Sequence, residues 1–403
     1  SLGGDETIGD LSGSGTIATN GNGLTINQTS DTAFTGTITG AGGLTTQGEA
    51  GLTLTNGSDF TGDANINAGT LTVSGLLATN TINVANEAAL TTTAADLLSS
   101  AATVTNDGTL TLGGDQTLTS LIGASTGVVN IGANNLILTG GANFQGRISG
   151  TNGTVSAGPG DLILGGDNTF TGLLTILDGS TTTLDGSVDG NVTVNTGAEL
   201  VLGSAERIAD GADLTVDGIL NTNGEETVNS LTATGTINGA GTVSALTTSL
   251  TDAAVNANLG DGALTSNGAT SLNGNANAST VTVASGTLTV NGALTNNSAA
   301  INVDAGTLAA DGTIAAASID VAQGATLTTE EAERLNDGVA LTNDGTVSLG
   351  GNETIGDLSG AGTITNNGND LAVTQTSDQT FSGTLSGAGG LTKQGEATLT
   401  LSN

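Results

Sequence analysis

The chain has 403 residues, with 38 Asp and Glu against four Lys and Arg, and a formal net charge of −34. That charge repels nucleic acid and anionic membrane surfaces, so we expect neither as a partner. The chain has no Cys, His, Met, Trp or Tyr, which excludes a disulfide scaffold and an aromatic-rich core. Because 36% of the residues are hydrophobic, the composition also argues against disorder.

Short runs of alternating apolar and polar residues recur along the chain between Gly, Asn and Asp residues. They are LTLT (52–55), LTV (71–73), TINV (81–84), LTLG (110–113), LILT (136–139), LILG (162–165), VTV (192–194) and INV (301–303). A period of two predicts strands with Leu, Ile and Val on one face and Thr or Asn on the other. Helical periodicity is limited to AADLLSS (94–100), SAERIAD (204–210) and EEAERLND (330–337), each of which predicts one helical turn or a small lateral loop.

A long repeat organises these runs. Residues 1–56 align without a gap to residues 348–403, and 40 of the 56 positions are identical. The chain therefore contains one full period of 347 residues and the start of the next, and we expect it to be part of a longer repeat array.

Shorter modules lie inside the period. Residues 90–121, 200–231 and 327–358 align without gaps, and a fourth copy of their closing part ends at Leu11. The modules run roughly over 11–121, 121–231 and 231–358, and the next period begins at 348. Their spacings of 110, 110 and 127 residues indicate a body that tolerates added or lost turns, as solenoids do.

Two all-β architectures compete at this point. One is a parallel β-solenoid in a single continuous rod, and the other is a string of antiparallel sandwiches of about 100 residues. The very short strands, the missing Trp and Tyr and the single Pro (Pro159) favour the solenoid.

The segment GAGGLTTQGEAGLTLTNGSDFTGDANINAGTLTVSG (40–75) resembles the passenger-associated transport repeat of bacterial autotransporters. Residues 158–186 and 387–403 resemble it too, while residues 245–300 depart most from it. The resemblance implies a right-handed parallel β-helix on the bacterial cell surface, outside the cell.

All five Phe residues precede a Gly by two positions: Phe34, Phe60, Phe144, Phe170 and Phe381. We expect them to reuse one structural position, just before a corner, and to cap the aliphatic core while the Gly lets the chain turn. The alternative is an aromatic ligand platform on the surface.

The residue types leave little room for catalysis. Without His, Cys or Tyr a general base would be a carboxylate, and the four cations (Arg147, Arg207, Arg334 and Lys393) are scattered. Glu225–Glu226 and Glu330–Glu331 could form an acid/base couple, but we interpret them as exposed turns. We therefore predict no enzyme and name no catalytic or cofactor residues.

Two other ligands remain open. Asp161, Asp178, Asp185, Asp189 and Asp344 could supply calcium ligands, although no calcium-binding nonapeptide recurs, and we expect at most weak or bridging Ca²⁺. Thr-rich runs could bind ice if they stayed in register through many coils, but the unequal modules argue against that regularity.

The resulting expectation is a non-catalytic, structural stalk or filament segment of a long, adhesin-like surface protein. The expected partners are neighbouring repeats of the same chain, other copies of the chain in a fibre or matrix, and a host or cell surface. This segment itself is expected to insert into no membrane. Three alternatives stay open: a self-assembling fibre, sheath or biofilm-matrix protein; an adhesin that binds through loops such as 204–210; and a polysaccharide-acting β-helix enzyme.

Overall fold

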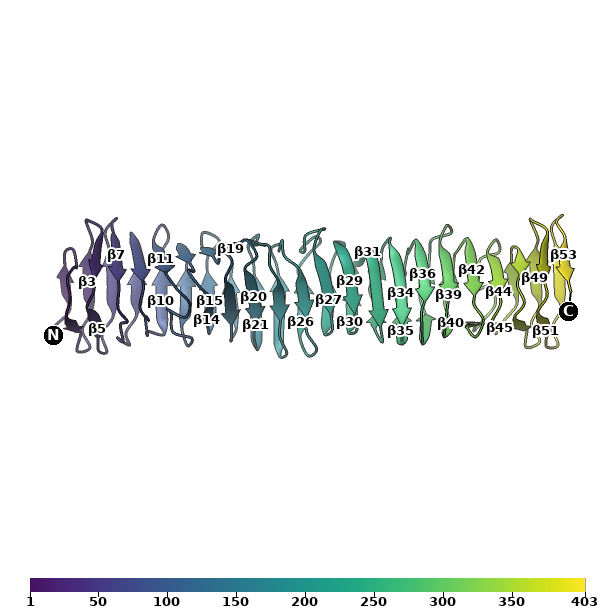
Figure 1. The fold of residues 1–403 in the computed structure, drawn as a ribbon, viewed down its shortest axis with the longest axis horizontal. Coiled ribbons are helices and arrows are strands. Elements are labelled where there is room, and N and C mark those ends of the chain that lie inside the picture. Colours follow the sequence, from purple (N-terminus) through teal and green to yellow (C-terminus); the bar gives the residue numbers. More distant parts are fainter. Residues whose placement is uncertain (403) are drawn as a thin grey trace. The chain divides into compact units, whose positions relative to one another are not determined.

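The computed structural model describes residues 1–402, and in that range it contains strands and turns but no helix. The chain divides into two compact units, Ser1–Ala212 (unit 1) and Asp213–Asn403 (unit 2). Each unit is a β-solenoid whose coils follow one another in sequence order (Figure 1).

The strands of unit 1 form three main sheets and one short pair. The broad sheet holds β1 (Glu6–Ile8), β3 (Leu24–Asn27), β6 (Leu44–Gln47), β8 (Ala64–Ile66), β10 (Thr81–Val84), β12 (Thr103–Asn106), β15 (Ser120–Gly123), β18 (Ala142–Phe144), β21 (Gly160–Leu164), β24 (Ser180–Leu184) and β26 (Glu199–Leu202). The side sheet holds β4 (Thr32–Phe34), β7 (Gly51–Leu54), β9 (Thr70–Val73), β11 (Ala89–Thr92), β13 (Thr109–Thr111), β16 (Val128–Asn130), β19 (Arg147–Gly150) and β22 (Thr169–Phe170). The back sheet holds β14 (Gln116–Leu118), β17 (Asn135–Leu138), β20 (Thr154–Ala157), β23 (Leu174–Ile176) and β25 (Val192–Val194), and β2 (Thr16–Ala18) pairs with β5 (Thr37–Thr39).

Unit 2 has two main sheets and three small ones. Its broad sheet holds β28 (Ile219–Thr222), β30 (Thr236–Gly239), β32 (Ala254–Val255), β35 (Ala269–Leu272), β37 (Thr287–Val290), β40 (Thr307–Ala310), β43 (Thr326–Thr329), β45 (Thr346–Leu349), β48 (Thr363–Thr365) and β51 (Thr384–Ser386). Its back sheet holds β27 (Asp213–Val216), β29 (Glu226–Ala233), β31 (Thr242–Thr251), β33 (Asn258–Leu259), β34 (Ala263–Asn267), β36 (Thr280–Val283), β39 (Ala300–Val303), β42 (Ser318–Val321), β44 (Ala340–Asn343) and β47 (Leu358–Ser359). The small sheets are β38 (Ala293–Leu294) with β41 (Thr313–Ile314), β46 (Glu353–Ile355) with β49 (Leu371–Thr374) and β52 (Leu391–Gln394), and β50 (Gln379–Phe381) with β53 (Leu399–Leu401).

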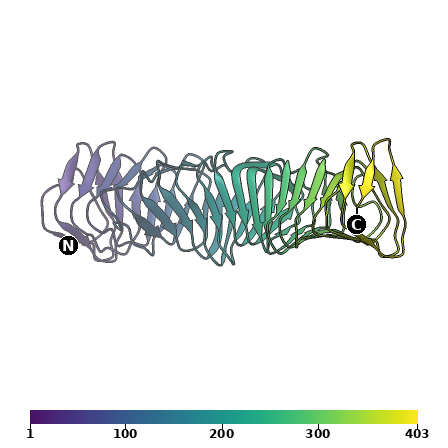
Figure 2. The ribbon, with the colours of Figure 1, turned by 45° about the vertical axis from the view of Figure 1, so that its right-hand side comes forward.

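Strand pairing within each unit is parallel, and it joins residues one coil apart. Leu44 pairs with Ala64 and Leu308 pairs with Leu327, which are 20 and 19 residues apart in the sequence. Figure 2 shows the strands of neighbouring coils lying side by side in each unit. This pairing confirms the parallel β-solenoid and excludes the antiparallel sandwich, whereas the right-handed winding stays a prediction.

The core follows directly from the alternation of side chains. Along β9, Leu71 and Val73 are buried while Thr70 and Thr72 are partly exposed, and the same pattern recurs in strand after strand. Each buried aliphatic side chain contributes about 1.5–3 kcal/mol relative to exposure, and the stacked coils place these residues in continuous columns. The thin aliphatic core expected from the composition is therefore present in both units.

All five Phe side chains are buried, with at most 3% of their surface exposed. That burial contradicts a surface platform of aromatic rings. Phe34 and Phe170 lie in the side sheet and Phe144 lies in the broad sheet, so the expectation of one reused structural position is wrong. What the Phe residues share is a place in the core beside a glycine.

The glycine two positions after a Phe is required by close approach between coils. A Cβ at Gly36 would lie 2.0 Å from the carbonyl oxygen of Gly15 and 2.4 Å from Cζ of Phe34. At Gly146 the corresponding distances, to Gly127 and Phe144, are 2.1 and 2.6 Å. Neither glycine has a positive φ, so the expected role in a tight turn is replaced by a role in packing.

The polar stretch 245–300, where the family resemblance is weakest, is part of the same solenoid. Asn256 Nδ2 donates to Oδ1 of Asn238 at 2.7 Å, Asn273 donates to Asn256 at 2.6 Å, and Asn291 donates to Asn273 at 2.6 Å. Stacked amides of this kind satisfy one another from coil to coil, so the small polar residues build a ladder at a corner of unit 2.

Candidate functional site

Three surface loops recur with the repeat, and we call them the arches: residues 94–100, 204–210 and 330–337. None contains a helix, so of the two expectations the small lateral loop is correct. Asp96, Glu206 and Glu333 occupy equivalent positions and have left-handed φ angles of 52°, 53° and 54°. Because non-glycine residues rarely adopt this conformation, the agreement indicates one specific arch geometry that is copied with each module.

A buried polar side chain from the next coil holds the arch in place. Under arch 94–100, Gln116 Oε1 accepts the backbone N–H of Leu98 at 3.1 Å, and its Nε2 donates to the Leu98 carbonyl at 2.9 Å. Under arch 330–337, the two oxygens of Glu353 accept the backbone N–H groups of Arg334 at 2.9 Å and Leu335 at 3.2 Å. Gln116 and Glu353 are both 1% exposed, so arches 94–100 and 330–337 are pinned from inside the solenoid.

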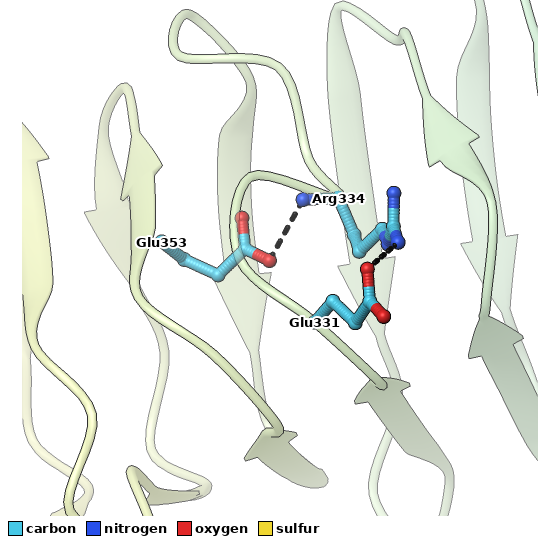
Figure 3. A network of polar contacts seen from close by, with 3 residues as sticks. All are labelled: Glu331, Arg334 and Glu353. Atoms are coloured by element: carbon cyan, nitrogen blue, oxygen red, sulfur yellow. Dashed lines mark hydrogen bonds and ion pairs between the residues drawn. The ribbon is translucent and has the colours of Figure 1, made fainter.

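Glu353 is the unusual pin because it carries a carboxylate into the core. Figure 3 shows its carboxylate directed at the backbone of Arg334, while the Arg334 guanidinium turns away to the exposed Glu331. Burial raises the pKa of Glu353, the two backbone hydrogen bonds lower it, and the nearby Glu333 raises it further. The carboxylate is therefore held by backbone N–H groups, without direct charge pairing to the arginine.

The coil after each of these two arches contains a Gly-Gly pair, and the closeness of the arch backbone explains why the second residue of the pair has no side chain. A Cβ at Gly114 would lie 2.3 Å from the backbone nitrogen of Ala95, and one at Gly351 would lie 2.1 Å from that of Ala332. The motifs LGGDQT and LGGNET thus let one coil pass directly beneath the preceding arch.

An open depression lies beside two of the arches, at equivalent positions. The first is lined by Leu76, Ala78, Asp96, Leu98, Ser99, Ser100 and Thr117. The second is lined by Thr313, Ile314, Ala315, Glu333, Arg334, Leu335, Asn336 and Asp337. The apolar Leu76 of the first is replaced by Thr313 in the second, and Leu97 beside the first corresponds to Arg334 in the second. The two depressions therefore share a shape but differ in chemistry.

A group of the acidic side chains accepts hydrogen bonds from the backbone of the next coil. A single carboxylate oxygen accepts a backbone N–H at 2.7–2.9 Å in eight pairs: Asp5–Gly23, Asp31–Gly51, Asp107–Ala124, Asp115–Asn135, Asp252–Ala269, Asp344–Ala361, Asp370–Gly390 and Asp378–Thr398. These contacts satisfy N–H groups at corners, where no strand continues the ladder. Part of the acidity of the chain is thus tied to its fold.

Asp10 and Asp357, which are one period apart, make the most extensive of these contacts. Asp357 accepts hydrogen bonds from the backbone and hydroxyl groups of Thr376 and Ser377. Burial raises the pKa of Asp357, but these hydrogen bonds outweigh it and the pKa lies below its ordinary value. The pKa of Asp10 is lowered in the same way, first by the hydroxyl of Ser30. Both carboxylates are therefore stabilised in their charged form.

The candidate calcium ligands do not converge. Within residues 1–402, no three His, Cys, Asp or Glu side chains form a group that could hold a metal ion. Of the five Asp residues considered from the sequence, Asp344 is engaged with the backbone of Ala361. Weak or bridging binding of Ca²⁺ to the acidic surface stays a prediction.

The two glutamate pairs differ from each other. Glu330 and Glu331 are exposed, as expected, whereas Glu226 lies in β29 and is only 1% exposed while Glu225 is exposed. The interpretation of Glu225–Glu226 as an exposed turn is therefore wrong for Glu226. Its position corresponds to those of Gln116 and Glu353, and the aligned modules are the signal that could have identified it.

The cations are used locally. Arg207 Nε donates to Ser204 Oγ at 2.9 Å, at the position equivalent to the contact of Arg334 with Glu331, and Lys393 Nζ donates to the Gly395 carbonyl at 2.8 Å.

No helix in residues 1–402 has the length and apolar character needed to cross a membrane. Comparison with protein-family models, curated proteins and solved structures finds no match to this chain. The resemblance to autotransporter repeats therefore stays a prediction.

Proposed function

We propose that the chain is a non-catalytic spacer segment of a long, extracellular bacterial surface protein, of the adhesin-like passenger type. Its role is to add length coil by coil and to hold other modules away from the cell. The 347-residue period and the parallel coil-to-coil pairing in both units support this proposal.

One observation carries the proposal: side chains capable of chemistry are used to join coil to coil. Carboxylates such as Asp252 accept corner N–H groups of the next coil, and Gln116 and Glu353 accept backbone N–H groups of the preceding arch. The asparagine ladder joins coils through side-chain amides. A side chain that is already engaged in hydrogen bonds between coils is poorly placed to act as acid, base or ligand.

Electron microscopy of producing cells, labelled with an antibody against this segment, tests the proposal. We expect thin projections, tens of nanometres long, that carry label at regular intervals set by the 347-residue period. Label confined to a continuous layer or to material between cells would instead assign the chain to a lattice or matrix. Label found only in the cytoplasm would contradict the proposal outright.

The recurring depressions beside arches 94–100 and 330–337 favour a second candidate function, direct adhesion through the arches. Replacing residues 94–100 and 330–337 with short Gly-Asn turns of equal length tests it. Loss of attachment by cells that still display the chain at full length would support adhesion through the arches. Unchanged attachment would leave the spacer role alone.

A further inference from the structure

The broad sheet of unit 2 lacks charged residues altogether within the described chain. None of its ten strands, from β28 to β51, contains Asp, Glu, Lys or Arg. The back sheet of the same unit carries Asp213, Glu226 and Asp320, and the broad sheet of unit 1 carries Glu6, Asp161 and Glu199. The five-stranded back sheet of unit 1 is uncharged as well, but the ten strands of this broad sheet, which we call the neutral face, are the longest uncharged run in the described chain.

Two columns of outward-facing residues run along this face in unbroken register. One consists of Ile219, Thr236, Ala254, Ser271, Thr289, Ala309, Thr328, Ser348, Thr365 and Ser386. The other consists of Ala269, Thr287, Thr307, Thr326, Thr346, Thr363 and Thr384. Six successive threonines in one column show that unequal modules do not disturb the register, so the sequence-based argument against such regularity is wrong.

We propose that the neutral face is an interface on which a second copy of this chain packs. Two copies that approach through any carboxylate-bearing face bring like charges together, and each such pair costs about 1 kcal/mol at 4 Å even in water. On the neutral face two copies can meet without that cost, over more strands than on any other uncharged sheet of the described chain. Short side chains repeated at regular spacing also suit it to interdigitated packing of one sheet on another.

The size of the face is sufficient for specific but weak association. Ten strands spaced by about 4.8 Å, each about 13 Å long, present roughly 600 Å². Two such faces bury about 1,200 Å² in total, which is the lower limit for a specific protein interface. Because carboxylates such as Asp252 and Asp344 border the face, we expect added salt to strengthen the association by screening their repulsion. This inference does not depend on the proposed spacer role.

Sedimentation velocity of the 403-residue chain over a concentration series, in low and high salt, tests the proposal. We expect reversible dimers that are favoured by salt. The double substitution Thr326→Glu and Thr346→Glu places two charges at paired positions in adjacent coils of the face and should weaken association at least about tenfold. The matched control, Thr265→Glu with Thr282→Glu, places the same charges at paired positions of the back sheet and should leave it unchanged.

A second readout avoids new charge. Since the chain contains no Cys, a single Thr326→Cys substitution reports contact through this face by cross-linking with a short bismaleimide, with Thr282→Cys as control. We expect several-fold more cross-linked dimer with Cys on the neutral face. A chain that stays monomeric in high salt, or equal effects of both substitution sets, would overturn the proposal. Monomeric chain that nevertheless retards ice growth would reassign the face to ice.

Discussion

Replacing Glu353 with Gln tests how arch 330–337 is held. Glu353 is 1% exposed, and its oxygens accept the backbone N–H groups of Arg334 and Leu335. Gln116 occupies the equivalent place under arch 94–100 and holds that arch with a neutral amide. The substitution therefore exchanges a charged pin for the neutral pin that the chain uses in another module.

We expect Glu353→Gln to raise the free energy of unfolding at pH 7 by about 1 kcal/mol. By analogy with Gln116, the amide keeps one accepted N–H and gains a donated bond to the arch carbonyl. Losing one charge-assisted hydrogen bond costs about 1.5–3 kcal/mol, whereas removing a charge from a buried site recovers several kcal/mol. Burial is the larger of these terms, so the neutral side chain is favoured.

The pH dependence gives the sharper measurement. Burial raises the pKa of Glu353 in the folded chain above its unfolded value. The stability that this group contributes is then fully present below the unfolded pKa of about 4.3, and it is lost as the pH rises through the folded pKa. Wild type and Glu353→Gln should therefore unfold alike near pH 4 and diverge towards pH 7, as followed by urea unfolding and by hydrogen exchange at the Leu335 amide.

The reciprocal substitution is the control. Gln116→Glu places a carboxylate under an arch that has Leu97 where the other arches have Arg207 and Arg334. It should lower the unfolding free energy by about 2 kcal/mol at pH 7, and acidification should reverse much of that loss. If Glu353→Gln were destabilising at every pH, the charge-assisted bonds would outweigh burial and the reasoning would be refuted.

Three further substitutions probe contacts between coils. Gly146→Ala places a Cβ about 2.1 Å from the Gly127 carbonyl oxygen and should cost about 1–3 kcal/mol, whereas Gly211→Ala, with open space around it, should be near neutral in thermal unfolding. Asp357→Ala removes a carboxylate whose pKa is lowered by its hydrogen bonds and should cost about 1 kcal/mol. In wild type, Asp357 contributes stability above its ordinary pKa and loses that contribution as the pH falls through its lowered folded pKa. The unfolding free energies of wild type and Asp357→Ala should therefore converge at acid pH. Asn273→Ala breaks the ladder on both sides and should cost about 1 kcal/mol, seen as faster hydrogen exchange in the adjacent coils.

The fold could be predicted from the sequence because a solenoid repeats its local pattern. Alternation in TINV (81–84) or LILT (136–139) fixes which side chains face the core, and the Gly and Asn residues between runs mark the corners. Parallel stacking then follows from strands too short and too close in sequence to form sandwiches. Each expected run matches a strand, or most of one, in the structure.

Contacts between coils were harder to predict because they depend on register. Gly36 and Gly146 resemble turn residues in the sequence, but they are small because a carbonyl of the preceding coil lies where a Cβ would be. Likewise, Glu353 has the local sequence of an exposed acidic turn, and only the position of the arch one coil earlier makes it a buried pin. Glu226 has the same kind of local sequence and is also buried. A side chain's partner about 20 residues away cannot be read from its neighbours in the sequence.

The distribution of charge in this chain follows from how its corners are satisfied. At several corners a backbone N–H loses its place in the ladder, and a carboxylate one coil earlier accepts it, as Asp107 does for Ala124. Where Asn takes this role, as Asn258 does for Asn275, the bond is kept without the charge. Carboxylates that serve corners leave the strands between them neutral, so a chain with a net charge of −34 can still present a neutral face. The same hydrogen bonds that hold the coils together thus determine where two copies can meet, and salt should promote that meeting rather than disrupt it.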